Sequence, residues 1–167
     1  SAQSYDWFGS ELAAGDFDGD GFADLAIGVP YEDVATVEDA GVAQVLYGGP
    51  GGLGWAGNQL WQQGAGIQDG QELDDLFGDT LAVGDFDGDG YADLAVGVPG
   101  EEVDGILAAG AVAILPGAAS GLSSEADQLF YQGVAIADGL EADDRFGSAL
   151  TAGDFDSRAR YLNVRNT

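Results

Sequence analysis

Two nine-residue segments of this chain concentrate carboxylates at a spacing that suits the binding of a metal ion. The first runs from residue 16 to residue 24 and the second from 85 to 93, and each has aspartate at loop positions 1, 3, 5 and 9. Alternate positions of a tightly curved loop can direct their oxygens inward, and position 7 can add a backbone carbonyl. The predicted ligands are the side chains of Asp16, Asp18, Asp20, Asp24, Asp85, Asp87, Asp89 and Asp93 and the carbonyls of Phe22 and Tyr91.

Calcium is the ion that these loops favour. It is a hard cation that takes about 6 to 8 oxygen ligands, and the glycine at position 6 (Gly21 or Gly90) allows the sharp turn around it. The loops are not EF-hands, because the glutamate expected at position 12 is replaced by Ile27 and Val96 and a strand pattern follows. Magnesium, which keeps its water and a strict octahedron, is a weaker candidate. We therefore expect two calcium ions per chain.

Polar turns made of Asp and Gly are the simpler explanation of such segments. Four carboxylates within nine residues repel one another unless they are protonated or bridged by a cation, and the pattern occurs twice, which favours the metal. A third copy keeps Asp154 and Asp156 but has Arg158 at position 5 and Leu162 at position 9. We expect no metal site there.

The overall charge excludes several classes of partner. The chain has 30 acidic and 4 basic residues, no histidine and a net charge of −26, so it repels nucleic acid and anionic membranes. A solvating acidic surface, as in a salt-adapted protein, is the alternative to cation binding. Without cysteine there is no disulfide and no zinc–thiolate site. No apolar run is long enough to span a bilayer, so we expect no membrane insertion.

The chain is an internal repeat. Phe8-Gly9 recurs as Phe77-Gly78 and Phe146-Gly147, and 36 of the 69 positions of the first two copies are identical without a gap. We therefore divide residues 1–156 into repeats at about 8–76 and 77–145 and a partial repeat at 146–156. Residues 157–167 form a divergent tail with three arginines, which we interpret as foreign to the repeat and not as a functional basic motif.

The predicted fold class is all-β. Apolar and small residues alternate in each copy, and glycine-rich turns follow. The expected strands cover 25–29, 42–47 and 60–61 in the first copy and 94–98, 111–115 and 129–130 in the second. Residues 31–40 and 100–109 differ most between the copies, so we expect surface loops there, either for recognition or without a partner.

The repeated elements resemble the FG-GAP family, found in integrin α-subunit propellers and bacterial surface proteins. Phe8-Gly9 gives the FG element, Gly28-Val29-Pro30 stands where the GAP element is expected, and the aspartate loop lies between them; the second copy matches in the same way. The resemblance implies four-stranded β-propeller blades, each with calcium in the hairpin loop between its first two strands. It also implies an extracellular or cell-surface location.

The number of copies is too small for a closed propeller, since propellers have about 4 to 8 blades. Two blades and a strand stub would form an incomplete propeller. We therefore expect closure by self-association, for example by three chains that give six blades.

The function that we expect is a non-catalytic binding or adhesion scaffold with structural calcium and a protein or glycan ligand. One alternative is an accessory domain of a secreted hydrolase, and another is a fragment that self-assembles into a propeller. Acids such as Glu72, Asp74, Glu141 and Asp143 are possible catalysts, but they recur at the repeat spacing, which favours a structural part. We predict that the chain is not an enzyme.

Overall fold

The computed structural model describes residues 5–133, 139–153 and 162–165. In these ranges all regular structure is β, and no helix occurs that could cross a membrane. The strands are β1 (Leu12–Gly15), β2 (Asp24–Val29), β3 (Val42–Leu46), β4 (Gln59–Trp61), β5 (Leu81–Gly84), β6 (Asp93–Val98), β7 (Ala111–Leu115), β8 (Gln128–Phe130), β9 (Ala149–Ala152) and β10 (Leu162–Arg165).

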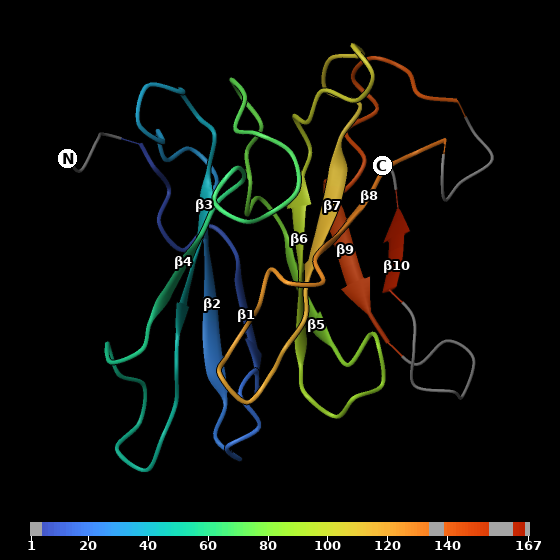
Figure 1. Cartoon of the computed structure of the whole chain (residues 1–167). Coiled ribbons are helices and arrows are strands. Elements are labelled where there is room, and N and C mark those ends of the chain that lie inside the picture. Colours follow the sequence, from blue (N-terminus) through green and yellow to red (C-terminus); the bar gives the residue numbers. More distant parts are fainter. Residues whose placement is uncertain (1–4, 134–138, 154–161, 166–167) are drawn as a thin grey trace.

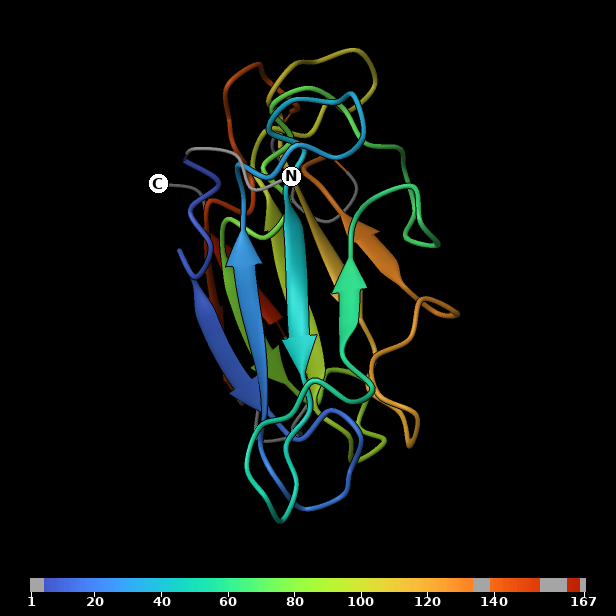
Figure 2. The same cartoon turned by 90° about the vertical axis from the view of Figure 1, so that its left-hand side faces the viewer.

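The strands form two four-stranded antiparallel sheets, which we call blade 1 (β1–β4) and blade 2 (β5–β8). Figure 2 shows the four strands of blade 1 side by side in chain order. The registers of the two blades are equivalent, since Leu12 pairs with Ile27 in blade 1 and Leu81 with Val96 in blade 2. The all-β blades expected from the sequence are therefore confirmed, and the 69-residue repeat is also a repeat of the structure.

The third repeat begins a further sheet. Its strand β9 packs against β5 and β6 of blade 2 and pairs antiparallel with β10. Strand β10 lies in the segment for which the sequence predicts a divergent tail, so part of that tail is an element of the sheet. Asp154, Asp156 and Arg158 lie outside the described residues, and the loss of the third metal site stays a prediction.

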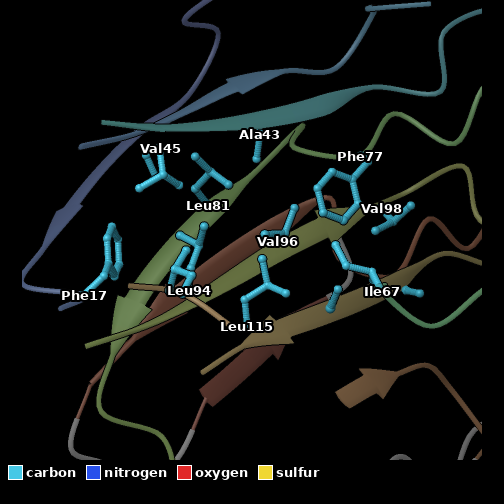
Figure 3. Close-up of a cluster of buried hydrophobic side chains, with 14 residues drawn as sticks. Phe17, Ala43, Val45, Ile67, Phe77, Leu81, Leu94, Val96, Val98 and Leu115 are labelled. Atoms are coloured by element: carbon cyan, nitrogen blue, oxygen red, sulfur yellow. The ribbon is translucent and has the colours of Figure 1, made fainter. Parts of the chain in front are cut away.

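The hydrophobic core lies between the blades (Figure 3). Blade 1 contributes Ala43 and Val45 from β3, and blade 2 contributes Leu94 and Val96 from β6. Full burial of one such aliphatic side chain stabilises the fold by about 1.5–3 kcal/mol. Since neither sheet covers this face alone, each blade needs its neighbour.

The Phe-Gly pair of each repeat completes the blade before it. Phe77 is fully buried, and its backbone N–H donates a hydrogen bond to the carbonyl of Ala40 at 3.0 Å. Phe146 repeats this contact with Ala109 at 2.9 Å. The sequence repeat is thus offset from the structural blade.

The glycine of each Gly-Val-Pro element allows this close approach. A Cβ atom on Gly28 would lie 2.1 Å from the carbonyl oxygen of Gly78, and one on Gly97 would lie 2.3 Å from that of Gly147. These clashes involve backbone atoms, which cannot rotate away. Glycine is therefore needed where a strand meets the Phe-Gly pair of the next repeat.

Positions of the first repeat are exposed where the equivalent positions of the second repeat are buried, because no blade precedes blade 1 in this structure. Phe8 is 66% exposed and Leu12 is 56% exposed, whereas their counterparts Phe77 and Leu81 are 0% and 6% exposed. We call the surface formed by Phe8 and Leu12 the open face of blade 1. It has the composition of an interface between blades.

The expectation of a surface loop at residues 100–109 is wrong for three of its residues. Glu101, Val103 and Ala109 are buried. The segment folds back on itself through paired backbone hydrogen bonds between Val103 and Ile106. Its start contacts Asp75 at the junction between the blades, and its end bonds to residues 143–146, while the tip is exposed.

Candidate metal centre

The first aspartate loop connects β1 to β2 and gathers three carboxylates. Oxygens of Asp16, Asp18 and Asp24 all lie within 4.8 Å of one another. Oxygens bound to one calcium ion at about 2.3–2.6 Å can lie at most about 5 Å apart, so this spacing fits a shared ion. Loop positions 1, 3 and 9 are thus brought together as the sequence predicts.

Asp24 anchors this group because it is held on both sides by the backbone. Its Oδ2 accepts a hydrogen bond from the Phe17 N–H at 2.7 Å, and its Oδ1 accepts one from the Gly48 N–H at 2.8 Å. The side chain is buried. These bonds tie the loop to the turn after β3.

Asp16 provides the feature that best fits a metal. Its Oδ2 accepts a hydrogen bond from the Gly21 N–H at 3.0 Å, but its Oδ1 is buried and has no hydrogen-bond partner. A buried acceptor without a partner is unfavourable by about 1–3 kcal/mol. A cation bound between Asp16, Asp18 and Asp24 would remove this penalty.

Asp20, at position 5, lies outside the group of three. Its Oδ1 accepts a hydrogen bond from the Phe22 N–H at 2.8 Å, which shapes the turn. Its role as a ligand, and that of the Phe22 carbonyl, stay predictions.

The second loop, between β5 and β6, has a different arrangement. Here oxygens of Asp85, Asp87 and Asp89 lie within 4.8 Å of one another, so positions 1, 3 and 5 come together. Asp93 is buried and accepts hydrogen bonds from the Phe86 N–H at 2.6 Å and the Gly117 N–H at 2.8 Å. It repeats the anchoring contacts of Asp24 but is not in the group. Its part as a ligand, and that of the Tyr91 carbonyl, stay predictions.

Burial raises the pKa of both anchoring carboxyls, Asp24 and Asp93, above the usual value. The backbone hydrogen bonds oppose this shift, whereas the nearby carboxylates of the same loop add to it. Each loop thus places one buried, poorly solvated carboxyl beside other carboxylates. A cation would favour the ionised form.

The first loop also contacts blade 2. The carbonyl of Asp16 accepts a hydrogen bond from the Ala92 N–H at 3.1 Å, and that of Phe17 accepts one from the Ala118 N–H at 3.1 Å. The Tyr91 ring packs so tightly on Gly19 that a Cβ there would lie 2.6 Å from the ring. The two loops are therefore neighbours. Sequence reasoning missed this contact because it links different repeats.

The chain forms two antiparallel four-stranded sheets that pack on each other through a shared core, and each sheet has an aspartate loop in its first hairpin. These features define the chain as a pair of β-propeller blades. The FG-GAP repeat matches residues 8–46 and 77–115. Both segments are FG-GAP repeats, and the chain belongs to this family.

Several named proteins are similar to this chain in sequence. The chain is 37% identical over 154 residues to integrin alpha-PS2 of Drosophila melanogaster, which covers 89% of this chain and 10% of the integrin. Integrin alpha-7 of Rattus norvegicus is 30% identical over 95% of this chain and 14% of its own length. The phosphatidylinositol-glycan-specific phospholipase D of Bos taurus is 32% identical over 70% of this chain and 14% of its own length. The chain therefore spans about a tenth to a seventh of these relatives.

Proposed function

We propose that this chain is a calcium-dependent, non-catalytic binding or adhesion scaffold, with one structural calcium ion in each aspartate loop. The observation that carries the calcium proposal is the buried, unpartnered Oδ1 of Asp16 beside the oxygens of Asp18 and Asp24. Oxygen ligands of this kind suit calcium. The ion would offset two of the four negative charges of the loop and fix the first hairpin of the blade.

Calcium content tests this proposal directly. After dialysis against buffered calcium, the loop variants Asp18→Ala and Asp87→Ala should each bind one ion fewer than the unchanged chain, because alanine leaves no side-chain oxygen at this position. Asp104→Ala is the matched control, because Asp104 is exposed and outside both loops. Equal calcium content in all four proteins would refute the loop sites.

The adhesion role is supported by the two integrin α relatives, which align with almost the whole chain. We propose an extracellular or cell-surface location and a protein or glycan ligand. Binding of the chain to immobilised glycans and cell-surface proteins, with calcium and with chelator, tests this role. Calcium-dependent binding would support the scaffold, and a panel without any binding would count against it.

An accessory domain of a hydrolase is the second candidate, because the bovine phospholipase D aligns with 70% of this chain. The chain lacks histidine, cysteine and lysine, so its own catalysis would depend on carboxylates or tyrosine. Assays with phosphodiester and glycoside substrates test whether the chain is catalytic by itself. Hydrolysis by this chain alone would overturn the non-catalytic assignment.

We also propose that the chain self-associates through the open face of blade 1, with a trimer of six blades as one solution. The support is the difference in burial between Phe8 and Phe77 and between Leu12 and Leu81. A second copy would cover Phe8 and Leu12 as blade 1 covers their counterparts. Light scattering in calcium buffer tests this. Leu12→Asp should reduce the mass, whereas Leu107→Asp, an exposed control, should not; a monomer at all concentrations would refute the association.

A further inference from the structure

A buried group of oxygens lies between the blades, apart from the aspartate loops. It consists of Gln63, Asp75 and Glu101, whose side chains are at most 1% exposed. We call it the junction cluster. Glu101 follows β6, whereas the second aspartate loop precedes it, so the two lie at opposite ends of this strand. In Figure 1 the end of β6 that leads to Glu101 is the upper one.

Three segments of the chain form the cluster. Gln63 follows β4 of blade 1, Asp75 precedes the Phe77 that joins the blades, and Glu101 belongs to blade 2. The Gly100 N–H donates a hydrogen bond to the carbonyl of Asp75 at 3.0 Å, which holds Asp75 beside the segment of Glu101. A Cβ on Gly100 would lie 1.7 Å from the carbonyl of Asp74, so the two segments are in direct contact.

Each side chain of the cluster makes a hydrogen bond, but one oxygen of each side chain has no hydrogen-bond partner. The Gln63 Nε2 donates to Glu101 Oε2, and the Glu72 N–H donates to Asp75 Oδ2 at 2.5 Å. Gln63 Oε1, Asp75 Oδ1 and Glu101 Oε1 remain buried without a partner. Each of these is unfavourable by about 1–3 kcal/mol unless something binds it. All three are acceptors, so the missing partner is a donor or a cation.

The chain itself offers no basic group for this role in its first 144 residues, which contain no lysine, arginine or histidine. Burial raises the pKa of Asp75 to about 7 and that of Glu101 to about 8, and the nearby carboxylates of Asp75 and Asp69 contribute to the shift at Glu101. Two buried carboxylates without a counter-charge are strongly unfavourable. A proton or a bound cation must accompany them.

We propose that the junction cluster is a third cation site, which binds one calcium ion through Gln63 Oε1, Asp75 Oδ1 and Glu101 Oε1. Calcium accepts carboxylate and amide oxygens in the same shell, and its two charges would offset those of Asp75 and Glu101, beside which Asp69 adds a third negative charge. The ion ties the end of blade 1 to blade 2 and is a clamp between blades. It does not depend on calcium in the aspartate loops.

The chain provides a matched control for this site. Glu32 occupies the position in the first repeat that Glu101 occupies in the second, and its side chain is only half-buried. The variants Glu101→Met and Glu32→Met therefore remove the same carboxylate from equivalent positions and leave no oxygen in the side chain that could bind calcium. A general effect of net charge would affect both alike.

Equilibrium dialysis against buffered calcium, with metal emission as the readout, tests the proposal on the full chain. Glu101→Met should bind one ion fewer than the unchanged chain, Glu32→Met should bind the same number, and Asp18→Ala should keep the junction ion while it loses its own. If Glu101→Met does not fold, Gln63→Met serves instead, because it removes Oε1 and puts an apolar side chain of similar length in its place. Calcium content that is the same in the unchanged chain and in the cluster variant would overturn the site and would leave a shared proton as the partner of the two carboxyls.

Discussion

Replacement of the phenylalanine that joins the blades should destabilise the fold strongly, and the same change one repeat earlier should not. Phe77 is fully buried and docks on blade 1, so Phe77→Ala removes a whole ring from the core. Such substitutions lower the free energy of unfolding by about 3–5 kcal/mol. Phe8 is 66% exposed, and surface substitutions change stability by only about 0.5 kcal/mol.

Thermal unfolding in calcium buffer at low protein concentration measures both variants under the same conditions. For a chain of this size, 1 kcal/mol shifts Tm by about 2–4 °C, so Phe77→Ala should melt about 6–20 °C lower and Phe8→Ala within about 2 °C of the unchanged chain. Both positions have the same residue and the same repeat context, so intrinsic preferences cancel. Equal losses of Tm would refute the view that each Phe-Gly pair completes the preceding blade.

Three further outcomes are expected. Gly28→Ala should lower the free energy of unfolding by about 1–3 kcal/mol through its clash with the Gly78 carbonyl, whereas Gly49→Ala, with no atom within 4 Å of the new Cβ, should have little effect in urea titrations. In calcium-free buffer the free energy of unfolding should fall as pH rises from about 5 to about 8, because folding raises the pKa of Glu101 to about 8 and favours its protonated form, which is lost above that pH. The groups that face Glu101 are Gln63, Asp75 and Asp69. Melting curves that do not differ between pH 5.5 and 8.5 would contradict this reasoning. Chelation of calcium at pH 7.5 should lower Tm, since an ion bound only to the folded state at about 100 times its Kd adds about 2.7 kcal/mol, and coincident melts with and without EDTA would make the ions incidental.

The regular parts of this fold were accessible from sequence because they depend on local patterns. Strands β2 and β6 follow from alternating apolar residues, and the aspartate loops from their spacing. The exposure of individual side chains could not be predicted from such local patterns. Phe17 and Phe86 occupy the same repeat position, yet Phe17 is fully buried against blade 2 and Phe86 only half-buried, because burial is decided by the neighbouring blade.

The junction cluster illustrates a second limit of sequence reasoning. Glu101 lies in the segment that differs most between the copies, and a variable, charged segment is usually a surface loop. Its burial depends on Gly100, which allows contact with Asp74 from the previous repeat. The recurrence of Glu32 and Gln63 as Glu101 and Gln132 was the available signal, since polar residues that recur at repeat spacing outside the metal loops indicate a shared structural role.

The offset between repeat and blade has a consequence for how such chains can evolve. Because the Phe-Gly pair at the start of one repeat finishes the blade of the previous one, a duplication of 69 residues inserts a new blade together with the contact that seals its predecessor. A gained copy therefore brings the residues of its interfaces with the blades on both sides. When a copy is lost, the two blades that become neighbours still have matching interfaces. Gene duplication can therefore change the number of blades in single steps, and positions without a neighbouring repeat, such as Phe8, remain confined to the ends of the array.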